Sequence, residues 1–160
     1  MIEAAAFKRA MRRIPTGVTI VTSLKDGAPR GLTLNAFAGV AIDPPALLVC
    51  VNREARSHLY ISSSRIFCVN VLAGTQRHLA EHFSGKVRDR QFETVPYHAD
   101  RTGAPVLDGA LAHFDCEVIG EHHVGSHSIF VGAVVGCAAN AGSPLGYFDG
   151  DYRDFGIATL

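Results

Sequence analysis

The chain lacks any long apolar segment. No stretch of its 160 residues approaches the roughly 20 apolar residues that a helix needs to cross a bilayer. The first fifteen residues also lack an apolar run long enough for a secretory signal. These absences predict a soluble, cytoplasmic protein with no membrane partner. Internal repeats are absent too, and the length suits one ordinary domain, so we expect residues 1–160 to form a single domain.

The chain also lacks an excess of charge of either sign. Its 15 Lys and Arg residues balance 15 Asp and Glu residues, which gives a formal net charge of zero. Domains that bind nucleic acid through bulk electrostatics usually carry a strong basic excess. We therefore expect no nucleic-acid partner.

Several catalytic signatures are missing. There is no GxGxxG turn, no Walker loop and no GxSxG elbow, and no pair of carboxylates has an evident catalytic spacing. Ser, His and Asp are present, but nothing in the sequence arranges them as a triad. If a nucleotide binds, it is held without a Rossmann turn.

Cysteine is scarce and unpaired. The four cysteines form no CxxC motif, and each lies inside an apolar segment, where a free thiol behaves as a small hydrophobic side chain. We expect neither disulfides nor thiolate-bound zinc. The cysteines are Cys50, Cys68, Cys116 and Cys137.

The remaining pattern is that of a mainly β protein. A short helix is expected over 3–13, where Phe7, Met11 and Ile14 recur at helical spacing before Pro15 stops it. Further short helices are expected over 57–63 and 75–83. Strands with hairpin-like turns at Asp26-Gly27 and around Gly125 indicate an antiparallel sandwich or barrel. The seven expected strands span 17–24, 31–40, 46–51, 66–72, 111–119, 128–138 and 145–148.

The expected strand 31–40 contains the first candidate for a binding site. Alternation places Leu32, Leu34 and Ala36 on one face, and Thr33, Asn35 and Phe37 on the other. The hydroxyl of Thr33 and the amide of Asn35 can hydrogen-bond a phosphate or the edge of a heteroaromatic ring. Taken alone, the segment is more simply explained as a polar, outward-facing strand surface.

A second candidate follows the apolar run 46–51, which we interpret as a buried strand. Asn52, Arg53, Arg56 and Ser57 gather where this strand ends and a helix begins, with Ser57 as the expected N-cap. A helix N-terminus has free amide donors and favours a phosphate, which arginine can bind through two hydrogen bonds. The alternative is a capped and solvated connection.

The third candidate is the histidine-rich segment around residues 122–127. His122, His123 and His127 suggest a metal, but no nearby cysteine or well-spaced carboxylate completes a site, so we expect none. A single histidine at the start of a strand, beside a bound ring system, is the stronger interpretation. A structural histidine is the simplest one.

Taken together, these segments resemble the short-chain flavin reductase family, the reductase components of two-component flavin monooxygenases. The motifs occur in the family's order over essentially the whole chain, although Ser126 replaces the usual Asp before the histidine and Arg65 replaces a usual Gly. They are FKRAMRRIPTGVTIVT (7–22), GLTLNAF (31–37), DPPALLVCVNREARSHLYI (43–61), IFCVNVL (66–72), HFSG (82–85), GSHSIFVGAV (125–134) and PLGYFDGDYRDFG (144–156).

The resemblance implies an FMN-binding split β-barrel, antiparallel and Greek-key-like, with two or three short flanking helices. It further implies a homodimer that transfers a hydride from NADH or NADPH to FMN or FAD and supplies reduced flavin to a partner monooxygenase. His127 would lie beside the isoalloxazine or the nicotinamide as the catalytic residue. The implied cofactor-binding residues are Thr33, Asn35, Ala36, Asn52, Arg53, Ser57, Phe83, Ser84, Gly85 and Tyr152.

Two other functions fit the same residues. One is a split-barrel protein that binds a flavin without turning over nucleotide. The other is an FMN-dependent oxidase with a substrate of its own, which would retain its flavin tightly.

Overall fold

The computed structural model describes residues 1–155, so Gly156, the last residue of the closing motif, lies outside the described residues. Helices and turns are α1 (Ala4–Met11), α2 (Arg56–Ser64), the 3₁₀ turn η1 (Gly74–Gln76), α3 (Arg77–Glu81) and the π-type turn η2 (His82–Lys86). The strands are β1 (Thr16–Gly17), β2 (Thr19–Lys25), β3 (Ala28–Leu34), β4 (Phe37–Ile42), β5 (Pro45–Asn52), β6 (Ile66–Val71), β7 (Tyr97–Ala99), β8 (Pro105–Leu107), β9 (Ala112–Val124), β10 (His127–Ala139), β11 (Leu145–Phe148) and β12 (Asp151–Asp154).

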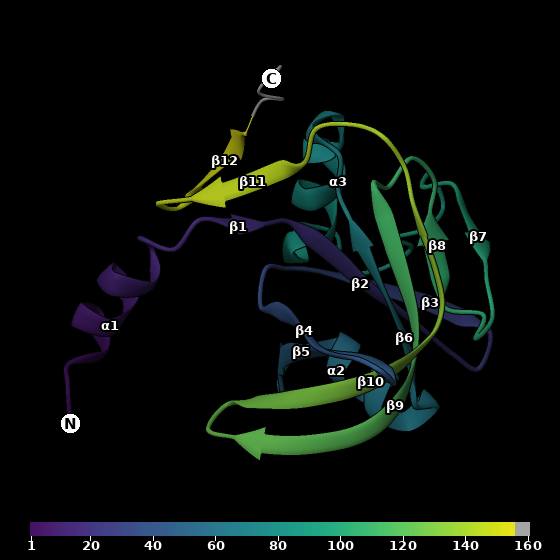
Figure 1. Ribbon diagram of the computed structural model, residues 1–160, viewed down its shortest axis with the longest axis horizontal. Coiled ribbons are helices and arrows are strands. Elements are labelled where there is room, and N and C mark those ends of the chain that lie inside the picture. Colours follow the sequence, from purple (N-terminus) through teal and green to yellow (C-terminus); the bar gives the residue numbers. More distant parts are fainter. Residues whose placement is uncertain (156–160) are drawn as a thin grey trace.

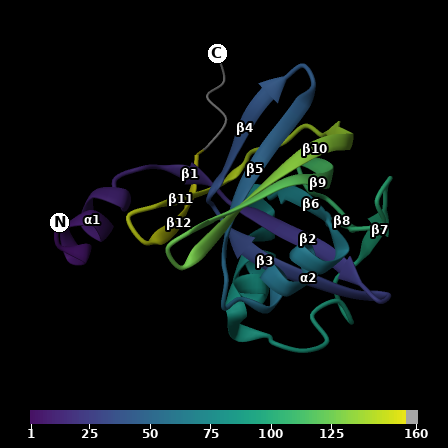
Figure 2. The ribbon, with the colours of Figure 1, turned by 90° about the horizontal axis from the view of Figure 1, so that it is seen from below.

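A seven-stranded antiparallel sheet forms the body of the molecule. Its order is β3-β2-β6-β9-β10-β5-β4, so β3 and β4, which follow each other in the chain, lie at opposite edges. The sheet curls so that the half with β4, β5 and β10 crosses over the half with β2 and β3 (Figure 2). The predicted mainly β, antiparallel split barrel is therefore confirmed.

The curled sheet encloses the main hydrophobic core. Strands β2, β5, β6, β9 and β10 contribute buried side chains to one cluster, and Ile61 of α2 joins them. A second cluster lies where α3 and η2 cover the other end, around Phe83 and Leu79. The main cluster consists of Val21, Leu47, Val49, Val51, Ile61, Phe67, Val69, Cys116, Val118 and Phe130.

The predicted turns are confirmed. Asp26 and Gly27 have φ values of 51° and 74° and join β2 to β3 as a two-residue hairpin, the conformation that Asp-Gly favours. Gly125, with φ 56°, lies in the turn between β9 and β10. Arg65 takes a left-handed conformation after α2, with φ 61°, where glycine would be unstrained.

The expected single strand over 31–40 is wrong. β3 ends at Leu34 and β4 begins at Phe37, and the carbonyl of Ala36 accepts a hydrogen bond from the Cys50 amide at 2.9 Å. Phe37 packs on the same core as Leu32 and Leu34, so the face assigned to it is wrong as well. The alternation of apolar and polar residues continues through Asn35 and Ala36, but at these residues the chain crosses from β3, at one edge of the sheet, to β4, at the other.

Other differences concern element ends and one strand face. Ala55, not Ser57, occupies the N-cap position of α2. The run 46–51 is buried on only one face, because Leu48 and Cys50 point outward and are half-buried. The sequence analysis missed β7, β8 and β12 and did not separate β1 from β2. Helix α1 is shorter than predicted, stands apart from the sheet and buries none of its residues (Figure 1).

All four cysteines are free, as expected. Burial raises the pKa of the thiols of Cys68 and Cys116, the latter to about 12. Within residues 1–155, no helix combines the length and apolar character that crossing a membrane requires.

Candidate functional site

Three depressions follow one another along β3 and the residues after it. The first, the arginine cleft, has a volume of about 300 Å3 and lies between β3, the start of α2 and the η2 turn. Its lining includes Arg30, Gly31, Ala55, Arg56, Ser57, Phe83, Gly85, Arg88 and Gln91.

The floor of the arginine cleft depends on Gly31. A Cβ atom at this position would lie 2.6 Å from the Phe83 ring, so only glycine lets the buried ring pack against β3. The Gly31 amide donates to Gln91 Oε1 at 3.1 Å, and Gln91 Nε2 donates to the carbonyl of Val87 at 3.1 Å. The buried Ser57 hydroxyl donates to the Gly31 carbonyl at 3.3 Å. These bonds fix β3, α2 and the loop after η2 around one space.

Positive charge gathers in the arginine cleft. Within residues 1–155, Arg30 Nε is the one buried side-chain nitrogen or oxygen without a hydrogen-bond partner. Burial, and after it the charge of Arg56, lowers the pKa of Arg30. Arg30 Nη1 donates to the carbonyl of Arg88, and Arg56 Nη1 pairs with Asp89 Oδ1 at 2.7 Å. Since the first turn of α2, which has no side-chain cap, also borders the cleft, the cleft suits an anion with several oxygens.

The second depression, the tyrosine cleft, has a volume of about 220 Å3. Its polar residues are held in place, since Thr33 Oγ1 donates to the carbonyl of Ala80 at 2.7 Å and Ser84 Oγ donates to that of Glu81 at 2.7 Å. The rings of Tyr147 and Tyr152 meet edge to face with centroids 5.6 Å apart, and burial raises the pKa of Tyr152. The lining is Val18, Thr33, Leu34, Asn35, Ser84, Tyr147 and Tyr152.

The third depression, the N-terminal cleft, continues the second. It has a volume of about 270 Å3, shares Asn35 and Tyr147 with the tyrosine cleft, and is bounded by the end of α1. Asn35 Nδ2 donates to Thr16 Oγ1 at 3.1 Å. Ala36 lines this cleft.

Eight of the eleven site residues expected from the sequence therefore lie along this row of clefts. Ser57, Phe83 and Gly85 line the arginine cleft. The tyrosine cleft contains Thr33, Asn35, Ser84 and Tyr152, and Ala36 lies in the N-terminal cleft. Together they form an apolar and hydrogen-bonding surface next to an anion site, which suits a ring system that carries a phosphate.

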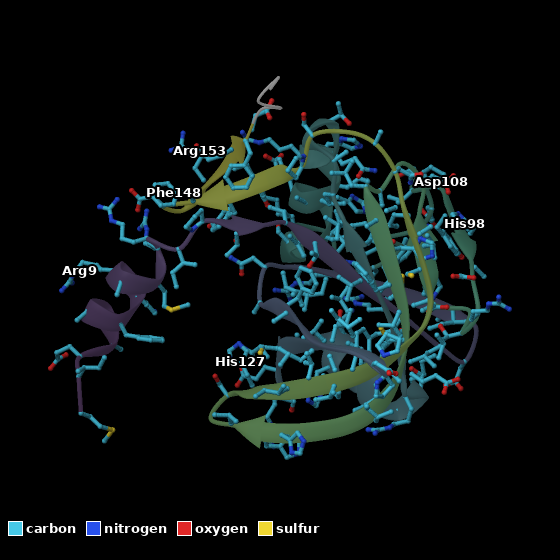
Figure 3. All side chains as sticks on the ribbon, viewed as in Figure 1. Arg9, His98, Asp108, His127, Phe148 and Arg153 are labelled. Atoms are coloured by element: carbon cyan, nitrogen blue, oxygen red, sulfur yellow. The ribbon has the colours of Figure 1, made fainter. Side chains whose placement is uncertain are left out.

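Three expected residues lie elsewhere in the subunit. His127 is exposed at the end of the β9–β10 hairpin, opposite Asn52 of β5 (Figure 3). Its Nδ1 is 2.9 Å from Ser126 Oγ. Asn52 Oδ1 accepts from the Glu54 amide at 2.9 Å. Arg53 lines a neighbouring depression with Glu54, His58 and Ser126, and Glu54 also lines the arginine cleft.

Sequence reasoning missed Arg30, Arg88, Gln91 and Tyr147. Arg30 directly precedes the GLTLNAF segment, so its place next to a candidate binding strand could have identified it as a site residue. Arg88 and Gln91 lie in the irregular segment after η2, and only the folded chain brings them to β3. Tyr147 lies in the predicted strand 145–148 and inside the closing motif, but the notable tyrosine there was taken to be Tyr152.

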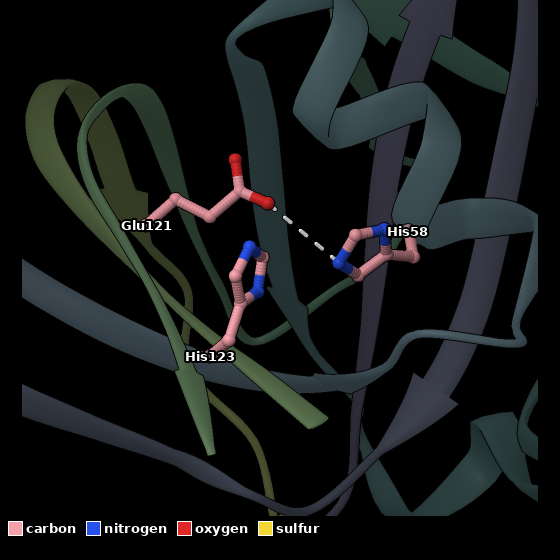
Figure 4. Close-up of side chains that lie close together, drawn as sticks. All are labelled: His58, Glu121 and His123. Carbon is pink, nitrogen blue, oxygen red and sulfur yellow. Dashed lines mark ion pairs between the residues drawn. The ribbon is translucent and has the colours of Figure 1, made fainter. Parts of the chain in front are cut away.

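A second polar group lies outside the clefts. His58, Glu121 and His123 each direct one potential metal-binding atom to a common point, and these atoms lie within 4.8 Å of one another (Figure 4). Burial is the main cause that lowers the pKa of His58. His122 and His127 are not part of this group. The signal in the sequence was Glu121 two residues before His123, because such residues share one face of a strand.

Comparison with known proteins gives consistent results. Residues 11–156 match the family described as Flavin reductase like domain. The chain is 35% identical to the reductase component of a 4-nitrophenol 4-monooxygenase/4-nitrocatechol 2-monooxygenase from Rhodococcus opacus, over 96% of this chain and 82% of that protein. It is 36% identical to FMN reductase (NADH) RutF 1 of Methylorubrum extorquens, over 95% and 77% of the two chains.

A solved structure shares the fold. The NADH:FAD oxidoreductase SgcE6 of Streptomyces globisporus C-1027, in complex with NAD and FAD fragments, superposes with a TM-score of 0.91 at 33% identity. The match covers 99% of this chain and 96% of that one.

Proposed function

The chain belongs to the flavin reductase like domain family, and we propose that it is an NAD(P)H-dependent flavin reductase. It transfers a hydride from NADH or NADPH to FMN or FAD, with residues 1–160 acting as one domain. The observation that carries the proposal is the row of neighbouring clefts along β3, in which an arginine-rich anion site precedes a surface of aromatic and hydroxyl side chains.

The arginine cleft is the site for the flavin phosphate. The unpartnered Arg30 Nε supplies a hydrogen-bond donor, Arg56 and Arg88 add positive charge, and the uncapped start of α2 borders the same cleft. Ser57 and Gly85 line the same space. A phosphate bound here would neutralise the positive charges of Arg30 and Arg56, which otherwise repel each other.

The tyrosine cleft is the site for the flavin ring. Thr33, Asn35 and Ser84 present polar atoms, while Tyr147 and Tyr152 present ring surface. The bound flavin supplies the redox chemistry, and the protein supplies orientation and electrostatics. Asn35 Nδ2 has a second N–H besides the one it donates to Thr16 Oγ1, and this donor would stabilise the negative charge that reduction places on the ring edge. The tyrosine cleft would hold one face of the ring and leave the other to the nicotinamide, because hydride transfer requires close and aligned contact.

His127 orients the nicotinamide and needs a second subunit to do so. Within one subunit it lies at the hairpin end and, like Asn52 and Arg53, lines none of the three clefts. A homodimer that sets this hairpin against the clefts of its partner completes the site. The central hydride step needs no protein proton, so orientation rather than acid–base chemistry is the assigned role of His127.

The exposed apolar side chains support the homodimer. Monomeric proteins rarely expose large apolar patches, and several large side chains here are at least 40% exposed. They lie on α1 and the turn after it, on the edge strand β4, and on the β9–β10 hairpin. They are Phe7, Met11, Ile14, Val40, Ile42, Ile119, Val124 and Val135.

Reduced flavin then passes to a partner monooxygenase. The relative from Rhodococcus opacus is named as the reductase component of such a system.

Steady-state oxidation of NADH and NADPH tests the proposal. The purified protein is assayed with FMN, FAD or riboflavin, with catalase present and without any oxygenase. We expect nucleotide oxidation that depends strictly on added flavin. A protein that binds flavin but oxidises neither nucleotide would be a binding module instead. Tightly retained flavin that only another substrate reduces would identify an oxidase.

A further inference from the structure

A polar cluster that flavin reduction does not use connects helix α2 to strand β9. His58 comes from the first turn of α2, and Glu121 and His123 lie on the same face of β9. His58 Nε2 and Glu121 Oε1 are 3.7 Å apart, and their side chains are only 14% and 16% exposed. His123 is exposed and closes the group from the solvent side (Figure 4).

The spacing of these atoms suits a small metal ion. Zinc binds imidazole nitrogen and carboxylate oxygen at about 2.0–2.2 Å, so two ligand atoms around a tetrahedral ion are about 3.4 Å apart. The 3.7 Å between His58 Nε2 and Glu121 Oε1 is close to that value. A small rotation of the exposed His123 side chain brings in the third ligand, since all three atoms already lie within 4.8 Å.

The ligands are held by their own partners, as in established metal sites. Ser62 Oγ lies 3.1 Å from Glu121 Oε2 and 3.3 Å from Oε1, and Arg65 Nη1 donates to Oε2 at 3.2 Å, which together hold the carboxylate with Oε1 3.7 Å from His58 Nε2. The His58 ring packs on Phe130 with centroids 5.1 Å apart. Two of the three side chains therefore need no reordering to bind an ion.

A buried hydroxyl lies beside the same point. Ser128 Oγ is 2.7 Å from His58 Nε2 and 2.8 Å from His123 Nδ1, and Ser128 has no exposed surface. An ion bound by the two histidines replaces these hydrogen bonds. It leaves a fourth position for the serine hydroxyl or a water molecule.

We propose that His58, Glu121 and His123 form a binding site for a divalent zinc-class ion. Two imidazoles and one carboxylate form a donor set typical of zinc, with three protein ligands and one open position. The bound ion ties α2 to the β9–β10 hairpin. Because Ser126 and His127 lie at the end of that hairpin, the ion also restricts the segment that carries His127.

Calorimetric titration with Zn²⁺ alone tests the site. The full-length protein is first stripped with a chelator and contains neither flavin nor nucleotide. We expect one ion per chain and a dissociation constant that rises at least tenfold in His123→Ala. His123 is exposed, so its truncation leaves the core intact. His122→Ala is the matched control and binds zinc like the wild type, because adjacent strand residues point to opposite faces.

Thermal unfolding supplies a second readout. An ion that binds only the folded state raises the unfolding temperature, so Zn²⁺ should stabilise the wild type and His122→Ala but not His123→Ala or Glu121→Gln. Absence of zinc binding by the wild type would overturn the proposal. So would equal binding by His123→Ala and His122→Ala, since the metal would then sit on other histidines. None of these outcomes depends on flavin reduction.

Discussion

Arg30 is the residue whose environment most directly indicates an anion. Its Nε is buried without a partner, and burial together with Arg56 lowers its pKa. A buried polar group without a hydrogen-bond partner destabilises the folded protein, and a phosphate bound beside it would supply the missing acceptor. From the sequence, Arg53 and Arg56 were the candidate phosphate ligands and Arg30 was not considered, because only the fold shows which arginines face the cleft.

Arg30→Met should therefore weaken FMN binding selectively. Loss of a charged hydrogen bond costs about 1.5–3 kcal/mol, which corresponds to about a tenfold or larger rise in the KM for FMN. The KM for riboflavin, which has no phosphate, should stay close to the wild-type value. Steady-state assays with both flavins measure this difference. An equal rise in the KM for FMN and in the KM for riboflavin would show that the phosphate does not bind in the arginine cleft.

Gly31→Ala should destabilise the fold. The added Cβ would lie 2.6 Å from the buried Phe83 ring, and overpacking of this kind costs about 1–3 kcal/mol. Gly17→Ala is the control, since a Cβ there meets nothing within 4 Å. Urea unfolding of the two variants gives the comparison. Equal midpoints would show that Phe83 does not pack on β3 as described.

His127→Ala should raise the KM for NADH or NADPH more than it changes flavin affinity. The side chain is exposed and hydrogen-bonded to its neighbour Ser126, so its removal leaves the subunit fold intact. Steady-state kinetics with each substrate varied in turn separate the two effects. Kinetics unchanged from the wild type would show that His127 does not contact the nucleotide.

At the scale of elements, helix α1 contributes no buried side chain to the core of its own subunit. Arg12 just after it pairs with Asp149 at 3.1 Å and so fixes its end near β11 and β12. Its apolar residues are available for a second subunit.

Phe7→Glu/Met11→Glu should therefore weaken the dimer. Each large apolar side chain contributes about 1.5–3 kcal/mol when buried, so the dissociation constant of the dimer should rise at least tenfold. Sedimentation velocity at several concentrations measures it. Lys8→Glu/Arg9→Glu introduces the same two side chains at neighbouring positions and should leave the dimer in place. If both double variants dimerise like the wild type, α1 is not part of the interface.

Elements with strong local signals were predictable, and those defined by distant partners were not. The Asp26-Gly27 hairpin was identified because its turn chemistry is local. The break at Asn35 and Ala36 was missed, since the alternation persists while Ala36 pairs with Cys50 of another strand. β7 and β8 are three residues each and pair only with each other, so neither has a length or pattern that stands out.

At the scale of the whole molecule, the family motifs indicated most of the cleft residues but not their arrangement. Thr33, Ser57 and Ser84 come from three separate segments and meet along β3 because α2 and η2 pack against this strand. His127 lies at the end of the β9–β10 hairpin and lines none of the clefts, and only the proposed homodimer would bring it to them. The row of clefts as the flavin site is the central claim about this molecule.

Anaerobic stopped-flow measurement of FMN bleaching by NADH tests that claim most directly, in the wild type, Ser84→Trp and Arg101→Trp. Ser84 is exposed and lines the tyrosine cleft, so an indole there fills the space for the ring while the core stays intact. Arg101 is also exposed and lines none of the three clefts. We expect Ser84→Trp to slow bleaching by about a hundredfold through misplacement of the ring, with Arg101→Trp like the wild type. Bleaching by Ser84→Trp at the wild-type rate would contradict the assignment.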